Sequence, residues 1–235
     1  MTVAETLLGL ALTVGVMHTL IGVDHAIPFI VLSRAQGWSL KKTWLITAAC
    51  GVGHVLSSVL IGGVGIGLGI AVSQLEWVEG QRGALAAWTL IGFGLAYMVW
   101  GLYRSWRSRS AAHLHEDGTV HRHEAHHHGH SHHHHGDFVT GGAPTVGALF
   151  IVFVLGPCEA LIPLLMVPAS QSDPWLVVAV VGVFGLATIA TMLTVVTLGY
   201  FGLRAKVFDV LERHVHTAAG LAIALSGLGI QLLGI

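Results

Sequence analysis

The chain has 235 residues, of which 54% are hydrophobic and only 10% charged, and its formal net charge at pH 7 is −1. Soluble domains carry about 25% charged residues, so this composition excludes a water-soluble protein and indicates one that crosses a membrane several times. The balanced charge gives no indication of a nucleic-acid partner. We expect neither nucleic-acid binding nor enzymatic activity. The chain contains no nucleotide-binding motif, so any energy that it uses must come from an ion gradient, the membrane potential or a partner.

Apolar segments long enough to cross a bilayer, which takes about 20 residues, occur along the whole chain. The first carries no Lys or Arg near its start, so we expect a retained span and not a cleaved signal. Pro28 interrupts this segment, and Pro157 with Pro163 interrupts the fourth. Prolines break the helical hydrogen-bond ladder, and broken helices are tolerated in a membrane where they line a cavity. The six predicted spans are 4–32, 43–70, 84–103, 144–169, 175–201 and 215–234.

The basic residues are distributed very unevenly between the connections. Ten of the 11 Lys and Arg residues follow the first, third or fifth span, and Arg82 is the exception. Cytoplasmic loops of membrane proteins carry an excess of Lys and Arg. We therefore expect a prokaryotic-type inner membrane protein with these three connections in the cytoplasm and both termini outside.

A short internal repeat relates the first and fourth spans. The stretch GVDHAIPFIVLSRA in the first aligns with GPCEALIPLLMVPA in the fourth, which puts Asp24 and His25 opposite Cys158 and Glu159. Each half holds three spans, an odd number, so the two halves must have opposite orientations in the membrane. The predicted fold is all-α and polytopic, with six transmembrane helices arranged as two inverted three-helix repeats, as in many secondary transporters.

The connection between the halves has a different composition. Residues 104–143 are polar and histidine-rich, so they cannot bury enough apolar surface to fold alone. Irregular spacing, intervening acids and a mid-chain position argue against a purification tag. Imidazole-rich tracts suit divalent nickel, cobalt, zinc and copper. We predict a disordered cytoplasmic loop that collects metal, with an inert linker as the alternative, between a first repeat at 1–103 and a second at 144–235. Its 12 histidines are His113, His115, His121, His123, His126, His127, His128, His130, His132, His133, His134 and His135.

Five ionisable residues fall in the interior of the predicted spans, away from the span ends. They are His18, Asp24, His25, His54 and Glu159. Each costs roughly 2.5–3.5 kcal/mol at a helix centre on insertion scales and marks a pathway or a paired site. Neutral imidazoles with a carboxylate make a plausible shell for a divalent cation, and Cys158 would bias that shell toward softer ions. The alternative for any one of them is a buried polar residue with a structural partner.

Helix geometry limits how these groups can act together. His18 and His25 are seven residues apart, which puts them on one face of a regular helix but about 10 Å apart along its axis. Either the helix unwinds near Gly22 and Pro28 so that both bind one ion, or the ion passes from one to the other. Asp24 points away from His25 in an ideal helix, so unwinding would again help.

For four further groups of residues the sequence gives weaker predictions. Glu76, Glu79 and Arg82 fall in an external loop, where we expect a solvated face. Cys50, one turn before His54, is expected to be a small core residue. Two histidines near the start of the last span could extend the metal-collecting loop or lie at the membrane interface; they are His214 and His216. Glycines at 62–69 are expected to serve close helix packing.

The residues of the first two spans resemble a known family. The pattern H-x5-D-H in HTLIGVDH, the stretch GVGHVLSS and the histidine-rich loop are together similar to the nickel/cobalt transporter superfamily. FGLATIATM and GPCEALIPLLMVPA are similar to its urease-accessory branch. The resemblance implies that His18, Asp24, His25 and His54 belong to a metal path. The best-known permeases of that superfamily have H-x4-D-H and more helices, which leaves the metal and the direction of transport open.

The leading hypothesis is a secondary transporter that moves Ni(II) or Co(II), with Zn(II) as a further candidate, by alternating access at a midplane site. The metal is cargo and no tightly bound cofactor is expected. The expected partners are the metal ion, the lipid bilayer and, as a candidate, a cytoplasmic metallochaperone. Two alternatives remain open. One is a membrane thiol–disulfide electron carrier, although Asp24 stands where its second cysteine would be; the other is a metal buffer or urease-type accessory protein that does not transport.

Overall fold

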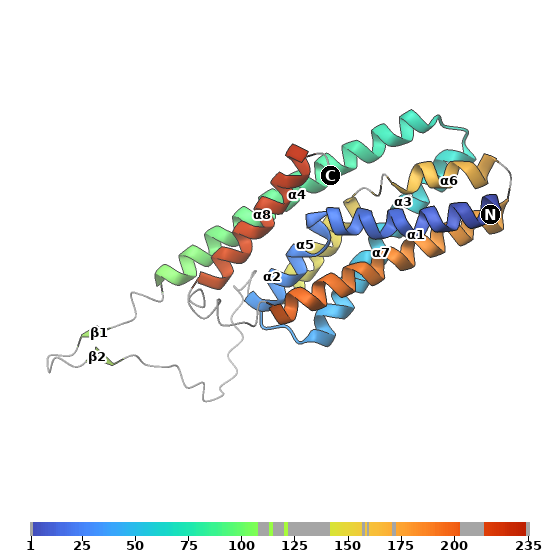
Figure 1. Cartoon of the computed structure of the whole chain (residues 1–235). Coiled ribbons are helices and arrows are strands. Elements are labelled where there is room, and N and C mark those ends of the chain that lie inside the picture. Colours follow the sequence, from blue (N-terminus) through green and yellow to red (C-terminus); the bar gives the residue numbers. More distant parts are fainter. Residues whose placement is uncertain are drawn as a thin grey trace.

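A computed structural model of the chain describes residues 2–107, 113–114, 120–121, 142–156, 158, 160–170, 173–202 and 214–233. Eight α-helices dominate these residues (Figure 1). The short strands β1 (His113–Leu114) and β2 (Val120–His121) pair antiparallel within the histidine-rich connection. The predicted disorder of that connection concerns residues that are mostly outside the described part of the chain.

The first predicted span is a broken helix. Helix α1 (Val3–Ile21) starts with a capping box between Thr2 and Glu5, and it ends where Gly22 leaves the helical conformation with φ −69° and ψ 98°. A single 3-10 turn, η1 (Val23–His25), follows before α2 (Ile27–Ala35) resumes with Pro28 in its first turn. Proline is tolerated there because the first helical N–H groups have no intrahelical partner. The predicted unwinding near Gly22 and Pro28 is confirmed.

Two long helices complete the first half, α3 (Leu40–Gly67) and α4 (Val72–Arg107). Gly37 and Gly69 adopt positive φ angles of 62° and 68° just after α2 and α3, and glycine reaches this left-handed region without steric cost. Helix α4 starts at Val72, not near residue 84 as predicted. The prediction was wrong because charged residues ended the apolar window, whereas the helix continues through them and buries Glu79 completely.

The second half repeats the pattern of a break followed by a long helix. Helix α5 (Gly142–Leu155) stops before Gly156, and α6 (Leu161–Ser170) resumes after a short connection. Pro157, which was predicted to cause the break, lies outside the described residues, whereas Pro163 lies in the first turn of α6 and interrupts nothing. Helices α7 (Pro174–Gly202) and α8 (Val215–Leu233) follow.

Helices α4 and α8 lie side by side along one edge of the molecule (Figure 1). Their contact is made by glycines that leave no room for a side chain. A Cβ at Gly94 would run into the backbone of Ala224, and a Cβ at Gly220 into the backbone of Met98. Such small-residue contacts let the backbones of membrane helices approach closely.

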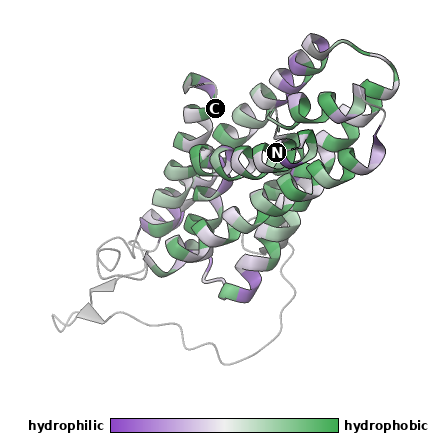
Figure 2. Cartoon of the chain, turned by 45° about the vertical axis from the view of Figure 1, so that its right-hand side comes forward, coloured by the Kyte–Doolittle hydropathy of each residue, from purple (hydrophilic) through white to green (hydrophobic). Residues whose placement is uncertain are grey.

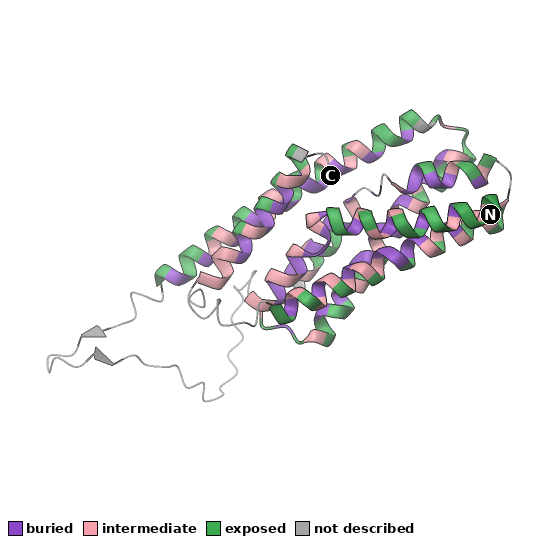
Figure 3. Cartoon of the chain, in the orientation of Figure 1, coloured by how far each residue is buried: buried purple, intermediate pink, exposed green. Residues whose placement is uncertain are grey.

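The surface and the interior of the helix bundle differ as expected for a membrane protein. Large apolar side chains are exposed, for example those of Leu45, Trp88 and Leu186. Hydrophobic positions and exposed positions occur along all the helices (Figures 2 and 3). Five described helices are long and apolar enough to cross a bilayer: α1, α3, α4, α7 and α8. The apolar parts of α5 and α6 are shorter. The chain is therefore an all-α multi-pass membrane protein.

Candidate metal centre

Three histidines from three different elements converge inside the bundle. His18 lies near the end of α1, His25 ends η1, and His54 lies midway along α3. One ligand nitrogen from each lies within 4.8 Å of the others. Nitrogens around a tetrahedral ion at about 2.0–2.1 Å are about 3.3–3.4 Å apart. Small side-chain rotations would close the remaining gap, so the cluster can hold a metal ion.

The break after α1 produces this convergence. On a continuous helix His18 and His25 would be about 10 Å apart, but their ring centroids are 4.8 Å apart. Gly22 makes the turn possible, because a Cβ at this position would run into the His25 imidazole and come within 3.0 Å of Asp24 Oδ1. Of the two alternatives drawn from the sequence, the geometry favours joint binding over passage along a regular helix.

In His25 and His54 the Nδ1 atom has a hydrogen-bond partner, so the Nε2 atom remains free to bind a metal ion. His25 Nδ1 lies 2.9 Å from Asp24 Oδ1, and His54 Nδ1 lies 3.3 Å from the backbone oxygen of Phe153. Carboxylate and carbonyl oxygens accept hydrogen bonds, so Nδ1 carries the proton in both rings. Within the described structure the Nε2 atoms of His25 and His54 are buried without a partner. Metal-binding histidines show this arrangement, with the far nitrogen held by a carboxylate or carbonyl, and the donor set fits an ion.

Cys158 adds a sulfur atom to the same place. It lies in the connection between α5 and α6, is fully buried, and its Sγ is 3.8 Å from His18 Nε2. The structure thus brings together His18, His25, His54 and Cys158, with Asp24 bound to the outer side of His25.

The other predicted metal residues are not part of this geometry. Glu159 lies outside the described residues, as do ten of the 12 loop histidines; of His113 and His121 only the backbone is described, in the β1–β2 pair. Cys50 is buried in an apolar cluster with Leu149 and Met192, as expected for a core residue.

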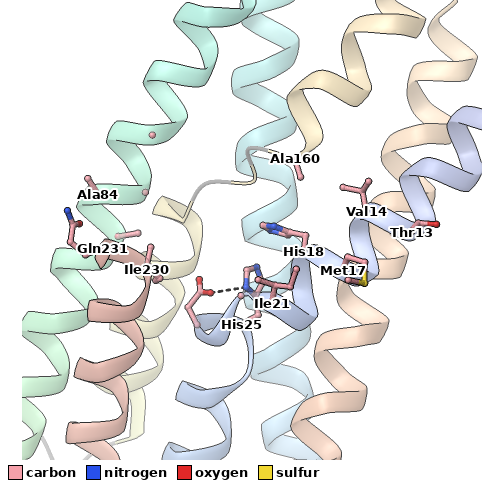
Figure 4. A pocket seen from close by; sticks show the side chains of 15 residues that line it. Thr13, Val14, Met17, His18, Ile21, His25, Ala84, Ala160, Ile230 and Gln231 are labelled. Atoms are coloured by element: carbon pink, nitrogen blue, oxygen red, sulfur yellow. Dashed lines mark hydrogen bonds and ion pairs between the residues drawn. The ribbon is translucent and has the colours of Figure 1, made fainter. Parts of the chain in front are cut away.

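A cavity of about 560 Å³ opens beside the centre (Figure 4). His18, Asp24 and His25 line one wall, and α4 and α8 supply the opposite wall with small or uncharged residues such as Ala84 and Gln231. His54 is not among the lining residues. His18, Asp24 and His25 are therefore the groups of the centre that are reached from the cavity.

Sequence reasoning missed two residues next to the centre. Glu79 and Arg82 were expected on a solvated face, but the Glu79 side chain is 0% exposed and the Arg82 side chain 12%, and they form an ion pair. The prediction was wrong because it placed them in a loop. A signal for Glu79 was available in the sequence, because it falls at helical spacing from the apolar residues Leu75 and Ala86. In the structure all three are buried and share one face of α4.

The two histidines near the start of α8 have separate partners. His216 Nδ1 lies 2.9 Å from the Tyr97 hydroxyl, and its ring centroid is 5.0 Å from that of Trp100. His214 Nδ1 lies 3.2 Å from the Ser105 hydroxyl. Both join α8 to α4, so the described structure gives them a packing role distinct from the metal centre.

One protein family matches the chain. The family described as "Cytochrome C biogenesis protein transmembrane region" matches residues 9–229. No curated protein and no solved structure is significantly similar to the chain. The match overturns the resemblance to the nickel/cobalt transporter superfamily and its urease-accessory branch, for which the comparisons give no support. That resemblance depended on short motifs, whereas the match covers nearly the whole chain. It supports the thiol–disulfide alternative better than metal transport.

Proposed function

Since the chain belongs to the family of cytochrome c biogenesis protein transmembrane regions, we propose that it is a membrane carrier in which the family scaffold has acquired a divalent transition-metal ion as cargo. The observation that carries this proposal is the convergence of His18, His25 and His54, with ligand nitrogens within 4.8 Å of one another. Three imidazoles from separate elements, two of them fully buried and His18 partly so, have no packing advantage over apolar side chains. A cargo ion explains why they are together.

The donor atoms define the class of ion. Imidazole nitrogen suits nickel, cobalt, zinc and copper, whereas Mg(II) and Ca(II) prefer oxygen ligands. The Cys158 sulfur 3.8 Å from His18 favours the softer members of this group. Ni(II), Co(II) and Zn(II) are therefore the cargo ions to test first.

The proposed mechanism is alternating access between two inverted halves. Both halves contain a helix that breaks at a glycine, Gly22 or Gly156, followed by a short helix and a long one. The short helices α2 and α6 have 9 and 10 residues, and the long helices α3 and α7 have 28 and 29. In this proposal α5 and α6 together make a sixth crossing. Sites at the meeting point of two broken helices are typical of inverted-repeat transporters.

The proposed orientation follows from the charges of the sequence. With the basic connections in the cytoplasm of a prokaryotic-type inner membrane, both termini lie outside and the histidine-rich connection faces the cytoplasm. There it would collect metal or receive it from a metallochaperone. The loop is accessory in this proposal, because the centre is complete without it.

Metal flux into proteoliposomes tests the proposal. We expect the wild type to move Ni(II) or Co(II), His25→Ala to lose at least about 90% of this flux because it removes a ligand, and deletion of 113–135 to retain most of it. His214→Ala is the matched control, since this imidazole contacts Ser105 away from the centre. No metal-dependent flux by the wild type, under any imposed pH gradient or potential, would refute the transporter.

The second candidate is a thiol–disulfide electron carrier, and the family match favours it. Such a carrier would oxidise two thiols to a disulfide and pass on two electrons and two protons. This chain has two cysteines, Cys50 and Cys158, both free in the described structure and buried in separate apolar clusters. In the repeat alignment, Asp24 and not a second cysteine matches Cys158.

Replacing Cys50 separates the two candidates. Under the metal proposal Cys50→Ala leaves metal flux unchanged, because Cys50 lies in the α3 core outside the centre. Under the electron-carrier reading the same substitution abolishes the disulfide and with it all electron transfer from a thioredoxin-like reductant. Mass spectrometry of differentially alkylated protein reads the thiol state. A reversible Cys50–Cys158 disulfide in the wild type, without metal flux, would establish the second candidate.

A further inference from the structure

The break between α5 and α6 creates a problem of unpaired backbone groups. The last carbonyl groups of α5 and the first N–H groups of α6 have no partner within their helices. In a membrane interior, water is not available to satisfy them, and each unsatisfied group costs several kcal/mol. Something else must bind them.

The guanidinium group of Arg82, from α4, binds the end of α5. Its Nη2 atom donates to the backbone oxygen of Val154 at 2.8 Å and approaches that of Gly156 at 3.4 Å. The same atom donates to the Ser57 hydroxyl on α3 at 2.8 Å. One side chain thus ties the C-terminal end of α5 to both α3 and α4.

The carboxylate of Glu79, one turn earlier on α4, binds the start of the next segment. Its Oε2 accepts from the backbone N–H of Cys158 at 3.1 Å and from the Ser58 hydroxyl at 3.1 Å. The Ser58 hydroxyl oxygen is itself 3.2 Å from the Cys158 nitrogen. The other carboxylate oxygen is paired with Arg82. Every described polar group around Cys158 N–H is therefore engaged.

The two charges have the signs that the two helix ends require. The C-terminal end of a helix carries partial negative charge, which favours a cation, and the N-terminal side favours an anion. Arg82 lies at the carbonyl end of α5, and Glu79 accepts from the N–H of Cys158 in the connection just before α6. If the two residues served only to neutralise each other, their order along α4 would not matter. The observed order also binds a carbonyl group on one side of the break and an N–H group on the other.

The capped segment forms a wall of the metal centre. Cys158 Sγ is 3.8 Å from His18 Nε2, and the Phe153 carbonyl holds His54 Nδ1 at 3.3 Å. A Cβ at Gly156 would lie only 3.2 Å from His54 Nδ1. The segment that Glu79 and Arg82 hold therefore contacts two of the three imidazoles, His54 through the backbone and His18 through the Cys158 sulfur.

We propose that the Glu79–Arg82 pair is a two-ended cap that holds the α5–α6 break in place and thereby positions Cys158 beside the three histidines. Both are positioning residues, since neither approaches the imidazoles. The capping part depends on geometry alone, whereas the positioning of Cys158 as a metal ligand rests on the proposed metal function. The proposal assigns the specificity of the centre in part to residues of α4.

The decisive variant reverses the pair, Glu79→Arg with Arg82→Glu. It keeps an ion pair but directs a donor at Cys158 N–H and an acceptor at the α5 carbonyls. The readout is the rate at which N-ethylmaleimide alkylates Cys158, the only remaining thiol in a full-length Cys50→Ala background in nanodiscs without metal. Glu76→Gln is the matched control, an exposed glutamate one turn earlier on α4.

We expect the reversed pair to speed alkylation at least about tenfold, the change in local opening that follows from losing charge-assisted hydrogen bonds, while Glu76→Gln matches the wild type. If the reversed variant is alkylated as slowly as the wild type, the proposed capping role is refuted.

Two milder variants test the proposal if the reversed variant does not fold. Arg82→Lys cannot span both carbonyls and Ser57, and Glu79→Gln loses the charge, so each should speed alkylation. Rates equal to the control in both would also overturn the proposal.

A second readout connects the cap to metal binding. Co(II) bound to a thiolate shows a sulfur-to-metal charge-transfer band, which Cys158→Ser must abolish. We expect Arg82→Lys to weaken this band relative to the d–d bands, because imidazole ligation survives better than the thiolate contact. If the wild type binds no Co(II), the metal function is refuted. The alkylation rates would still test whether Glu79 and Arg82 hold the α5–α6 break in place. A wild-type band unchanged in Arg82→Lys and Glu79→Gln would refute the positioning role alone.

Discussion

At the scale of single residues, the position of one proton decides whether an imidazole can bind a metal ion. Asp24 and the Phe153 carbonyl accept from the Nδ1 atoms of His25 and His54, which leaves both Nε2 atoms as lone-pair donors. Asp24 thus acts on the centre through His25. Its negative charge also offsets part of the charge of an incoming cation.

We predict that Asp24→Asn weakens Ni(II) or Co(II) binding about 10–100-fold, the usual cost of removing a carboxylate partner of a metal-binding histidine. The amide keeps the size of the side chain but loses the charge. Calorimetric titration of the protein in nanodiscs, with residues 113–135 deleted, measures the affinity of the centre. Asp173→Asn is the control, because Asp173 caps α7 through Leu176 N–H at 3.0 Å and lies in another part of the chain. Equal affinities in both variants would contradict the role of Asp24.

Gly22 should be intolerant of even the smallest side chain. A Cβ there would overlap the His25 ring and come within 3.0 Å of Asp24 Oδ1. We expect Gly22→Ala to displace His25 and to reduce metal affinity at least about tenfold, as misplacement of one ligand does. Gly9→Ala in the same helix is the control, since no neighbouring atom of the described structure lies within 4 Å of its Cβ position. Unchanged affinity in Gly22→Ala would show that the turn adapts.

At the scale of elements, α4 joins the two halves of the molecule. It contacts α8 along glycine-lined faces, and it sends Glu79 and Arg82 into the α5–α6 break. Glu79 and Arg82 lie about three to four turns before Gly94 on α4, so packing at Gly94 and capping can be tested separately. Close backbone contact at the glycines holds α4 and α8 together, with side-chain contacts of His214 and His216 in addition.

We predict that Gly94→Ala destabilises the protein by about 1–3 kcal/mol, the usual cost of overpacking a tight interface. The added methyl group would meet the backbone of Gly220 and Ala224, which cannot rotate away. Gly92→Ala, two residues earlier, is the control because its Cβ would meet no described atom within 4 Å. Unfolding in mixed micelles compares the two. If both variants unfold at the same denaturant concentration, the contact between α4 and α8 at Gly94 can adapt to a methyl group, and the prediction is wrong.

At the scale of the whole molecule, hydropathy and proline positions predicted most of the architecture. Helix geometry left two alternatives for His18 and His25, unwinding of the helix or passage of the ion between them, and the structure shows the break at Gly22 and the convergence. The helical spacing of Glu79 could indicate its burial, but the partners of Glu79 and Arg82 could not be predicted, because they are backbone groups of residues more than 70 positions away along the chain. The family entered only through the thiol–disulfide alternative, because Asp24 stands where the second cysteine would be.

Metal binding should stabilise the whole chain through the centre and not through the histidine-rich connection. A ligand that binds only the folded state at 100 times its Kd stabilises it by about 2.7 kcal/mol, and binding to the unfolded chain reduces that gain. The 12 loop histidines lie largely outside the described helices and would bind metal in folded and unfolded chains alike. We therefore expect Ni(II) to raise the thermal unfolding midpoint as much in the 113–135 deletion as in the wild type.

The same experiment should depend on His54 and on pH. His54→Ala removes a buried ligand, so the Ni(II)-induced shift of the midpoint should vanish even with the loop intact. Protons compete with metal for imidazole nitrogen, and the shift should shrink from about pH 7.5 to about pH 5, across the range where histidine titrates. A shift that survives His54→Ala but disappears on deletion of the loop would place the metal in the loop. The helices would then serve as its anchor, and the three buried imidazoles would need another explanation.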